Sequence, residues 1–128
     1  MGEDVNSFLP LSPAILHILL ALAGEDRHGY GIMQEITRQS EGQYKMGPGT
    51  LYDNLQKLVN HEMVEDAARR FADDDPRRRY YRLTPFGRRV LTAEIARLEG
   101  VVRTARASLR TPSPRRASGA PLTQLPSV

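Results

Sequence analysis

Arginine side chains crowd one short part of this 128-residue chain, and their chemistry is that of anion binding. A guanidinium group is always charged and donates hydrogen bonds in a planar fork that matches a phosphate group. Such groups can contact DNA phosphates or enter a narrow minor groove, which anchors a protein without selecting a sequence. The arginines flank a polar stretch, and we take five of them as candidate DNA contacts: Arg69, Arg70, Arg77, Arg78 and Arg79.

Other kinds of site chemistry are nearly missing from the sequence. There is no cysteine, which excludes disulfides, thiolate catalysis and thiolate metal sites. His17, His28 and His61 are widely spaced and form no visible ligand pair, and the acidic run 73–75 before Pro76 is typical of a solvated turn. Without a nucleophile and base pair, a phosphate-cradling loop or a metal-spaced cluster, we expect no enzyme, no metal and no cofactor.

A polar helix precedes the arginines. From Gly49 onward, apolar residues at positions 51, 55, 58 and 59 form one face of about three helical turns. The opposite face mixes hydrogen-bond donors and acceptors, which is what reading base edges in a major groove requires, although an ordinary solvated face has the same composition. The base-edge or groove-wall candidates are Thr50, Asn54 and Lys57.

Further candidate contacts lie at the helix entries. Gly29-Tyr30-Gly31 opens a helix, and small residues there let backbone amides approach a phosphate closely. Tyr30 and Tyr52 can place hydroxyl groups on the same DNA backbone, or can simply pack at a domain edge. Lys45, in the turn-rich connector 41–49, is well placed for a phosphate.

The elements that position these residues follow from their start and stop signals. Ser12-Pro13 starts a helix that ends at Gly24, and a second helix runs from Gly29 to about Ser40. Segments 64–70 and 77–84 predict two strands of a hairpin around a polar loop. Three helices, a hairpin and a further helix predict a mainly α fold with a small antiparallel β-hairpin, the winged helix-turn-helix.

The final helix begins at Thr84-Pro85 and predicts a partner helix. Its apolar residues are spaced 4, 3, 4, 3 and 4 apart, which favours a two-helix seam and hence a homodimer. A single helix packed back on its own domain is the alternative. The residues of the seam, which are the candidate dimer contacts, are Leu91, Ile95, Leu98, Val102, Ala105 and Leu109.

The chain thus divides into an N-terminal arm (1–10), a winged helix-turn-helix domain (11–84), a dimerisation helix (85–110) and a disordered basic tail (111–128), which either contacts phosphates or is idle. Net charge is −6 over residues 1–66 and +9 over residues 67–128, as suits a polyanionic partner. Without a long apolar run or a signal peptide, we expect a cytoplasmic protein with no membrane partner.

The ordered motifs resemble the PadR-type transcriptional regulators, in their short form with one helix after the wing. The likeness covers about residues 11–109 and rests on three motifs: His-Gly-Tyr-Gly-Ile at 28–32, Gly-Thr-Leu-Tyr at 49–52 and Arg-Tyr-Tyr-Arg-Leu-Thr-Pro-Phe-Gly at 79–87. It implies a dimeric DNA-binding protein, most often a repressor, whose last helix supplies the dimer contact and near whose dimer interface ligands can bind.

Two departures from that family pattern lie at the end of the third helix and in the wing loop. Glu62-Met63 replaces the usual Gly and Leu at the end of the third helix, so we expect Asn60 or His61 to adopt the left-handed cap. An acidic triad, 73–75, replaces the glycine and proline frequent in the wing loop, which leaves the depth of wing insertion open.

Two hypotheses of function remain. The first is a homodimeric repressor on an inverted-repeat operator in double-stranded DNA, released by a small-molecule effector of unspecified identity. The second is a winged-helix module that binds a protein partner through the same surface and does not bind DNA, for which the acidic first half of the chain leaves room.

Overall fold

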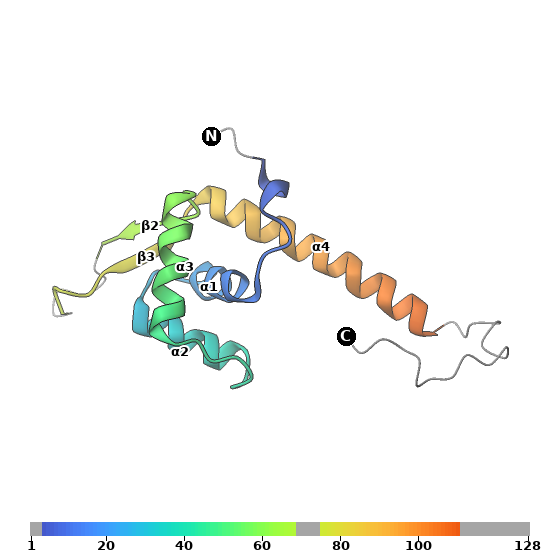
Figure 1. Cartoon of the computed structure of the whole chain (residues 1–128), viewed down its shortest axis with the longest axis horizontal. Coiled ribbons are helices and arrows are strands. Elements are labelled where there is room, and N and C mark those ends of the chain that lie inside the picture. The colour runs from blue at the N-terminus through green and yellow to red at the C-terminus, as the bar shows by residue number, and fades with distance from the viewer. Residues whose placement is uncertain (1–3, 69–74, 111–128) are drawn as a thin grey trace. The chain divides into compact units, whose positions relative to one another are not determined.

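The computed structural model describes residues 4–68 and 75–110. Its elements in chain order are a 3-10 helix Val5–Phe8, α1 Pro13–Ala23, β1 Arg27–His28, α2 Gly29–Gln39, α3 Pro48–Asn60, β2 Val64–Ala67, β3 Tyr80–Leu83 and α4 Pro85–Arg110 (Figure 1). The predicted fold class is confirmed. The described residues fall into two units that are divided between Ile95 and Ala96, and α4 runs from the first into the second. Within the described ranges, no helix is long and apolar enough to cross a bilayer.

The helix starts follow the predicted capping chemistry, with one addition. Ser12 accepts a hydrogen bond from the Ile15 amide at 3.2 Å, so it satisfies a donor that has no partner inside α1. His28 caps α2 in the same way, because its Nδ1 accepts from the Gly31 amide at 3.1 Å. The glycine motif that predicted this helix start therefore works together with an imidazole cap.

The core of the first unit lies between α1, α2 and α3. The apolar residues that predicted these helices are its centre: Ile18, Leu19, Leu22, Ile32, Ile36, Leu51, Leu55 and Leu58 are all buried. Burying each such side chain contributes about 1.5–3 kcal/mol. The N-terminal arm joins this core, since Phe8 packs edge-on against the rings of His61 and Phe86.

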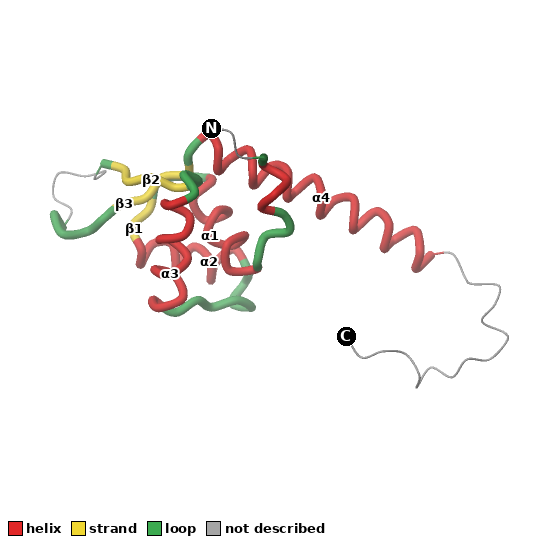
Figure 2. Tube along the Cα trace, turned by 45° about the horizontal axis from the view of Figure 1, so that its top comes forward, coloured by secondary structure: helices red, strands yellow, loops and turns green. Residues whose placement is uncertain are grey.

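The sheet has three strands in the order β1-β3-β2, all antiparallel (Figure 2). The two hairpin strands are predicted by the sequence but are shorter than expected, and β1 is an addition. It pairs Arg27 with Tyr81 and His28 with Tyr80. Two residues are too few to show the alternation by which a strand is recognised in a sequence.

The turn from α3 into β2 differs from the expectation. Glu62, with φ of 62°, takes the left-handed conformation, whereas His61 stays at φ −95°. The amide of Met63 then bonds the carbonyl of Leu58 at 2.9 Å, which closes the end of the helix. The prediction of Asn60 or His61 for this role was wrong, because α3 extends to Asn60 with His61 as its C-cap, so the left-handed position falls on Glu62.

Thr84 ties this turn to the start of α4. Its amide donates to the Met63 carbonyl at 3.0 Å and its hydroxyl donates to the Glu62 carbonyl at 2.6 Å. The same hydroxyl accepts from the Gly87 amide at 2.9 Å. Thr84 therefore links the turn between α3 and β2 to the start of α4.

The first turns of α4 belong to the core of the first unit. Val90, Leu91 and Glu94 are buried, and Glu94 Oε2 accepts from the Leu11 amide at 3.1 Å. Leu91, which the sequence analysis assigned to the dimer seam, is 4% exposed and packs in the core of the first unit. In the second unit, the side chains from Val101 to Arg110 are exposed.

Candidate nucleic-acid interface

One surface of the first unit consists of the exposed side of α3 and the β2–β3 hairpin beside it. We call the hairpin the wing. The buried residues Leu51, Leu55 and Leu58 fix the rotation of α3 about its axis. The other side of the helix then carries exposed polar side chains: Thr50, Tyr52, Asp53, Gln56, Lys57 and Asn60. The apolar face of α3 is packed in the core and its polar face is exposed to solvent, so the helix can bind a partner as a rigid body.

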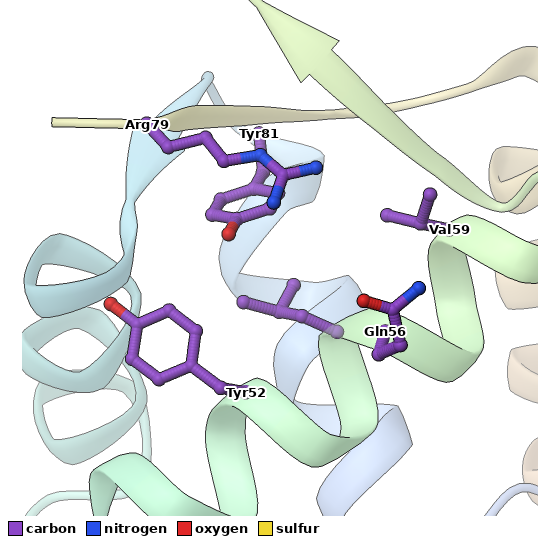
Figure 3. Close-up of a pocket in the computed structure, with 6 residues that line it drawn as sticks. Tyr52, Gln56, Val59, Arg79 and Tyr81 are labelled. Carbon is purple, nitrogen blue, oxygen red and sulfur yellow. The ribbon is translucent and has the colours of Figure 1, made fainter. Parts of the chain in front are cut away.

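The two edges of this polar face have different neighbours. Tyr52 and Gln56 face the wing, where they line a hollow of about 100 Å³ with Arg79 and Tyr81 (Figure 3). Lys57 lies on the opposite edge, beside a second hollow of about 180 Å³ that Phe8 and other residues of the N-terminal arm help to form. The sequence-predicted candidate Lys57 therefore belongs to the edge away from the wing.

Thr50 and Asn54 are held in place by the helix itself. The Asn54 side-chain amide donates to the Thr50 carbonyl at 2.8 Å, and Asn54 is half-buried. Gln56, which sequence reasoning did not select, is exposed and bonds Asn60 Oδ1 at 3.1 Å. The hydrophobicity pattern places Gln56 on the polar face of the helix, but it does not show which polar residues a neighbouring hairpin will flank.

Tyr52 depends on the absence of a side chain at Gly29. A methyl group built on Gly29 would overlap the Tyr52 hydroxyl and come within 2.8 Å of the carbon that bears it. Tyr52 is 48% exposed and Tyr30, at the start of α2, is 60% exposed. The glycine motif at 29–31 therefore lets the tyrosine of α3 lie against the first turn of α2.

The wing arginines have acidic neighbours that the sequence analysis overlooked. Arg79 Nε donates to Asp66 Oδ1 at 2.6 Å, and its guanidinium carbon lies 5.2 Å from the centre of the Tyr81 ring. The hydrogen bond to Asp66 raises the pKa of Arg79, and burial raises the pKa of the Tyr81 hydroxyl. The strand register, which pairs Asp66 with Tyr81, was the signal that could have revealed this contact.

The remaining wing arginines are placed as follows. Arg82 bonds Asp26 at 3.1 Å and lies across from Glu65, whereas Arg77 is highly exposed and bonds Asp75 at 3.3 Å. Arg78 Nη1 lies 3.1 Å from His28 Nε2, which brings the wing to the first turn of α2. The wing thus carries separate ion pairs, Arg77 with Asp75, Arg79 with Asp66 and Arg82 with Asp26, and their arginines are exposed.

Several sequence-predicted residues lie elsewhere or beyond the description. Lys45 is exposed in the connector before α3. Arg69 and Arg70 fall outside the described residues, as does most of the acidic loop. In the described ranges, no three side chains of the metal-ligating types come together. Of the predicted seam, Val102 and Leu109 are 46% and 85% exposed, Ala105 is exposed and Leu98 is half-buried.

Comparison with known proteins agrees with this architecture. Residues 15–93 match the Transcriptional regulator PadR-like family. Transcriptional regulator Rv3488 of Mycobacterium tuberculosis is 38% identical over 88 residues, which are 69% of this chain and 78% of that protein. A PadR family transcription regulator from Clostridium difficile superposes with a TM-score of 0.65 at 19% identity, covering 77% of this chain and 99% of that one. PadR of Bacillus subtilis, solved in complex with operator DNA, superposes with a TM-score of 0.57 at 19% identity, covering 67% of this chain and 48% of that one.

Proposed function

We propose that this chain, which belongs to the PadR-like family of transcriptional regulators, binds duplex DNA with α3 in the major groove and the wing on the flanking backbone. The family consists of transcriptional regulators and not of enzymes. The observation that carries the proposal is the single surface on which the polar face of α3 adjoins a hairpin rich in exposed arginines. The bound operator of the Bacillus subtilis relative is consistent with it.

We propose different DNA contacts for different parts of this surface. Asp53 lies in the middle of the exposed face of α3 and Gln56 lies at the edge of that face beside the wing, where a carboxylate accepts from the amino group of cytosine and an amide suits adenine. Thr50, Asn54 and Lys57 meet the groove along the edge away from the wing. Phosphate contacts come from Tyr30, Lys45, Tyr52 and the wing arginines at positions 77–79.

The proposed regulator acts as a homodimer. The seam contains Ile95, Leu98, Val102, Ala105 and Leu109, without Leu91, because Leu91 is used by the core of its own protomer. Two copies related by a twofold axis present two α3 helices to half-sites about one DNA turn apart, so the operator is an inverted repeat. Occupying such an operator blocks transcription, and a small-molecule effector relieves the block. Sedimentation at twice the 14.4 kDa protomer mass tests the dimer.

The experiment that tests DNA binding is a gel shift on the DNA upstream of the coding sequence, with scrambled competitor, across a salt series. Lys57→Ala and Arg78→Ala should each weaken the shift. The matched control is Arg88→Ala, which removes one exposed positive charge from α4, outside the surface formed by α3 and the wing. Equal weakening by the control would show that net charge, and not this surface, is responsible.

A protein-interaction module is the second candidate, and the acidic partners of the wing arginines favour it. Asp66 and Asp26 already pair with Arg79 and Arg82, as in a surface adapted to something other than a polyanion. Retention of no DNA, specific or random, even at low salt would support this candidate and contradict the first.

A further inference from the structure

The ion pair between Asp66 and Arg79 lies at the junction of the wing and α3. We propose that Asp66 is an internal competitor for a DNA phosphate at Arg79, so that it limits how tightly the wing holds any duplex. The inference rests on the proposed DNA-binding function and adds to it the residue that sets the strength of one backbone contact.

The strand register places this pair on the side of the wing that faces α3. Asp66 lies opposite Tyr81 in the register of β2 and β3, and Arg79, the residue before β3, has its guanidinium over the Tyr81 ring. The hollow that Arg79 lines also contains Tyr52 and Gln56 of α3 (Figure 3). Any phosphate that runs between α3 and the wing therefore passes this guanidinium.

The pair is accessible to such a phosphate. The side chains of Arg79 and Asp66 are 57% and 64% exposed, and Arg79 Nε lies 2.6 Å from Asp66 Oδ1. The guanidinium carbon also lies over the Tyr81 ring, 5.2 Å from its centre, and this cation–π contact does not involve Asp66. A phosphate can therefore take the place of Asp66 without a change in the backbone.

When a DNA phosphate replaces Asp66 as the partner of Arg79, the number of ions released on binding changes. Each phosphate neutralised by a protein cation releases condensed counterions, which makes binding fall with salt. In the wild-type protein, the released carboxylate of Asp66 attracts cations again and repels the phosphates nearby, so part of that gain is cancelled. Removing its charge restores both the affinity and the salt dependence that Arg79 can supply.

Glu65 offers a matched control on the same strand. It is the neighbour of Asp66 and carries the same charge, but it lies opposite Arg82, on the other side of the wing. Its distance from Arg82 is 3.9 Å, and Arg82 has a closer partner in Asp26 at 3.1 Å. Glu65→Gln therefore changes the net charge by the same amount without freeing Arg79.

The test compares the wild-type protein with three single variants, Asp66→Asn, Glu65→Gln and Arg79→Ala. A double variant, which carries both Asp66→Asn and Arg79→Ala, completes the set. Fluorescence anisotropy on a labelled 30-base-pair duplex of random sequence, as a salt series, gives affinity and salt slope for each. Circular dichroism melts check that every variant is folded.

Asp66→Asn should bind roughly three- to tenfold more tightly, from loss of the competing pair and of charge repulsion. Its slope of log K against log salt should steepen by up to about 0.9 per protomer. Glu65→Gln should change affinity less than twofold, and Asp66→Asn should not steepen the slope once Arg79 is alanine.

Two results would overturn the inference while leaving the proposed function standing: wild-type affinity and slope for a folded Asp66→Asn, or an equal gain from Glu65→Gln. Failure of the wild-type protein to bind any duplex at low salt would instead overturn the proposed function itself.

Discussion

Gly87→Ala should destabilise the protein, although alanine is the better helix former. A methyl group built on Gly87 lies 2.9 Å from Leu83 Cδ1, 3.0 Å from the carbonyl carbon of Met63 and closer still to the Met63 oxygen. That oxygen belongs to the backbone and accepts the hydrogen bond from the Thr84 amide. It therefore cannot move away from the new methyl group without breaking the bond that links the turn after α3 to the start of α4. Overpacking of this kind costs about 1–3 kcal/mol, more than the gain of about 1 kcal/mol in helix propensity.

Urea denaturation followed by circular dichroism measures this effect, at one protomer concentration because dimer stability depends on it. A loss of about 2 kcal/mol lowers the midpoint by roughly 1 M. Gly100→Ala is the matched control, since in the same helix its new methyl group meets nothing nearer than Arg103 Nη2 at 3.6 Å. We expect that variant to gain up to about 1 kcal/mol. Equal or greater stability of Gly87→Ala, with the denaturant dependence unchanged, would refute the packing argument.

Three other perturbations follow from the structure. Thr84→Val should cost about 2 kcal/mol of unfolding free energy in the same assay, because it leaves the Gly87 amide without its acceptor. The pKa of Glu35 lies below its ordinary value of 4.5, mainly because its carboxylate accepts a hydrogen bond from Arg38. The paired carboxylate therefore stabilises the fold above that pH. The stability difference between wild type and Glu35→Gln should therefore shrink as pH falls through and below about 4.5, and a constant difference would contradict the pairing. Arg78→Ala should weaken binding to all DNA sequences alike and flatten the salt dependence in anisotropy titrations, whereas a loss at one base position only would contradict a phosphate contact.

The fold was predictable from the sequence where local chemistry decides it. The pairs Ser12-Pro13 and Thr84-Pro85 mark helix starts in any context. The hydroxyl accepts a hydrogen bond from a backbone amide of the first turn, and proline lacks the amide that would otherwise need a partner there. The buried leucines of α3 follow directly from their spacing. Such signals need only neighbouring residues, which a single sequence contains.

Several of the missed features depend on contacts between distant segments. β1 is a strand only because β3 lies beside it, and Glu94 is buried because Leu11 bonds it from the N-terminal arm. Leu91 fits both a heptad and a 3.6-residue period, so only the packing of the first unit decides between the two. The candidate site was predictable as a set of residue types, but the pairing of Arg79 with Asp66 required the strand register.

The central claim is that the outward face of α3 lies in a DNA groove, and the absence of cysteine allows a direct measurement. An iron chelate attached to Gln56→Cys, on the duplex that the protein selects from a random pool, cuts the DNA strands nearest to that side chain. Cleavage should fall inside the protected half-sites, and a chelate on the exposed Thr92→Cys of α4 should cut these positions weakly. Cleavage from Thr92 but none from Gln56, on DNA that both labelled proteins bind, would contradict the account.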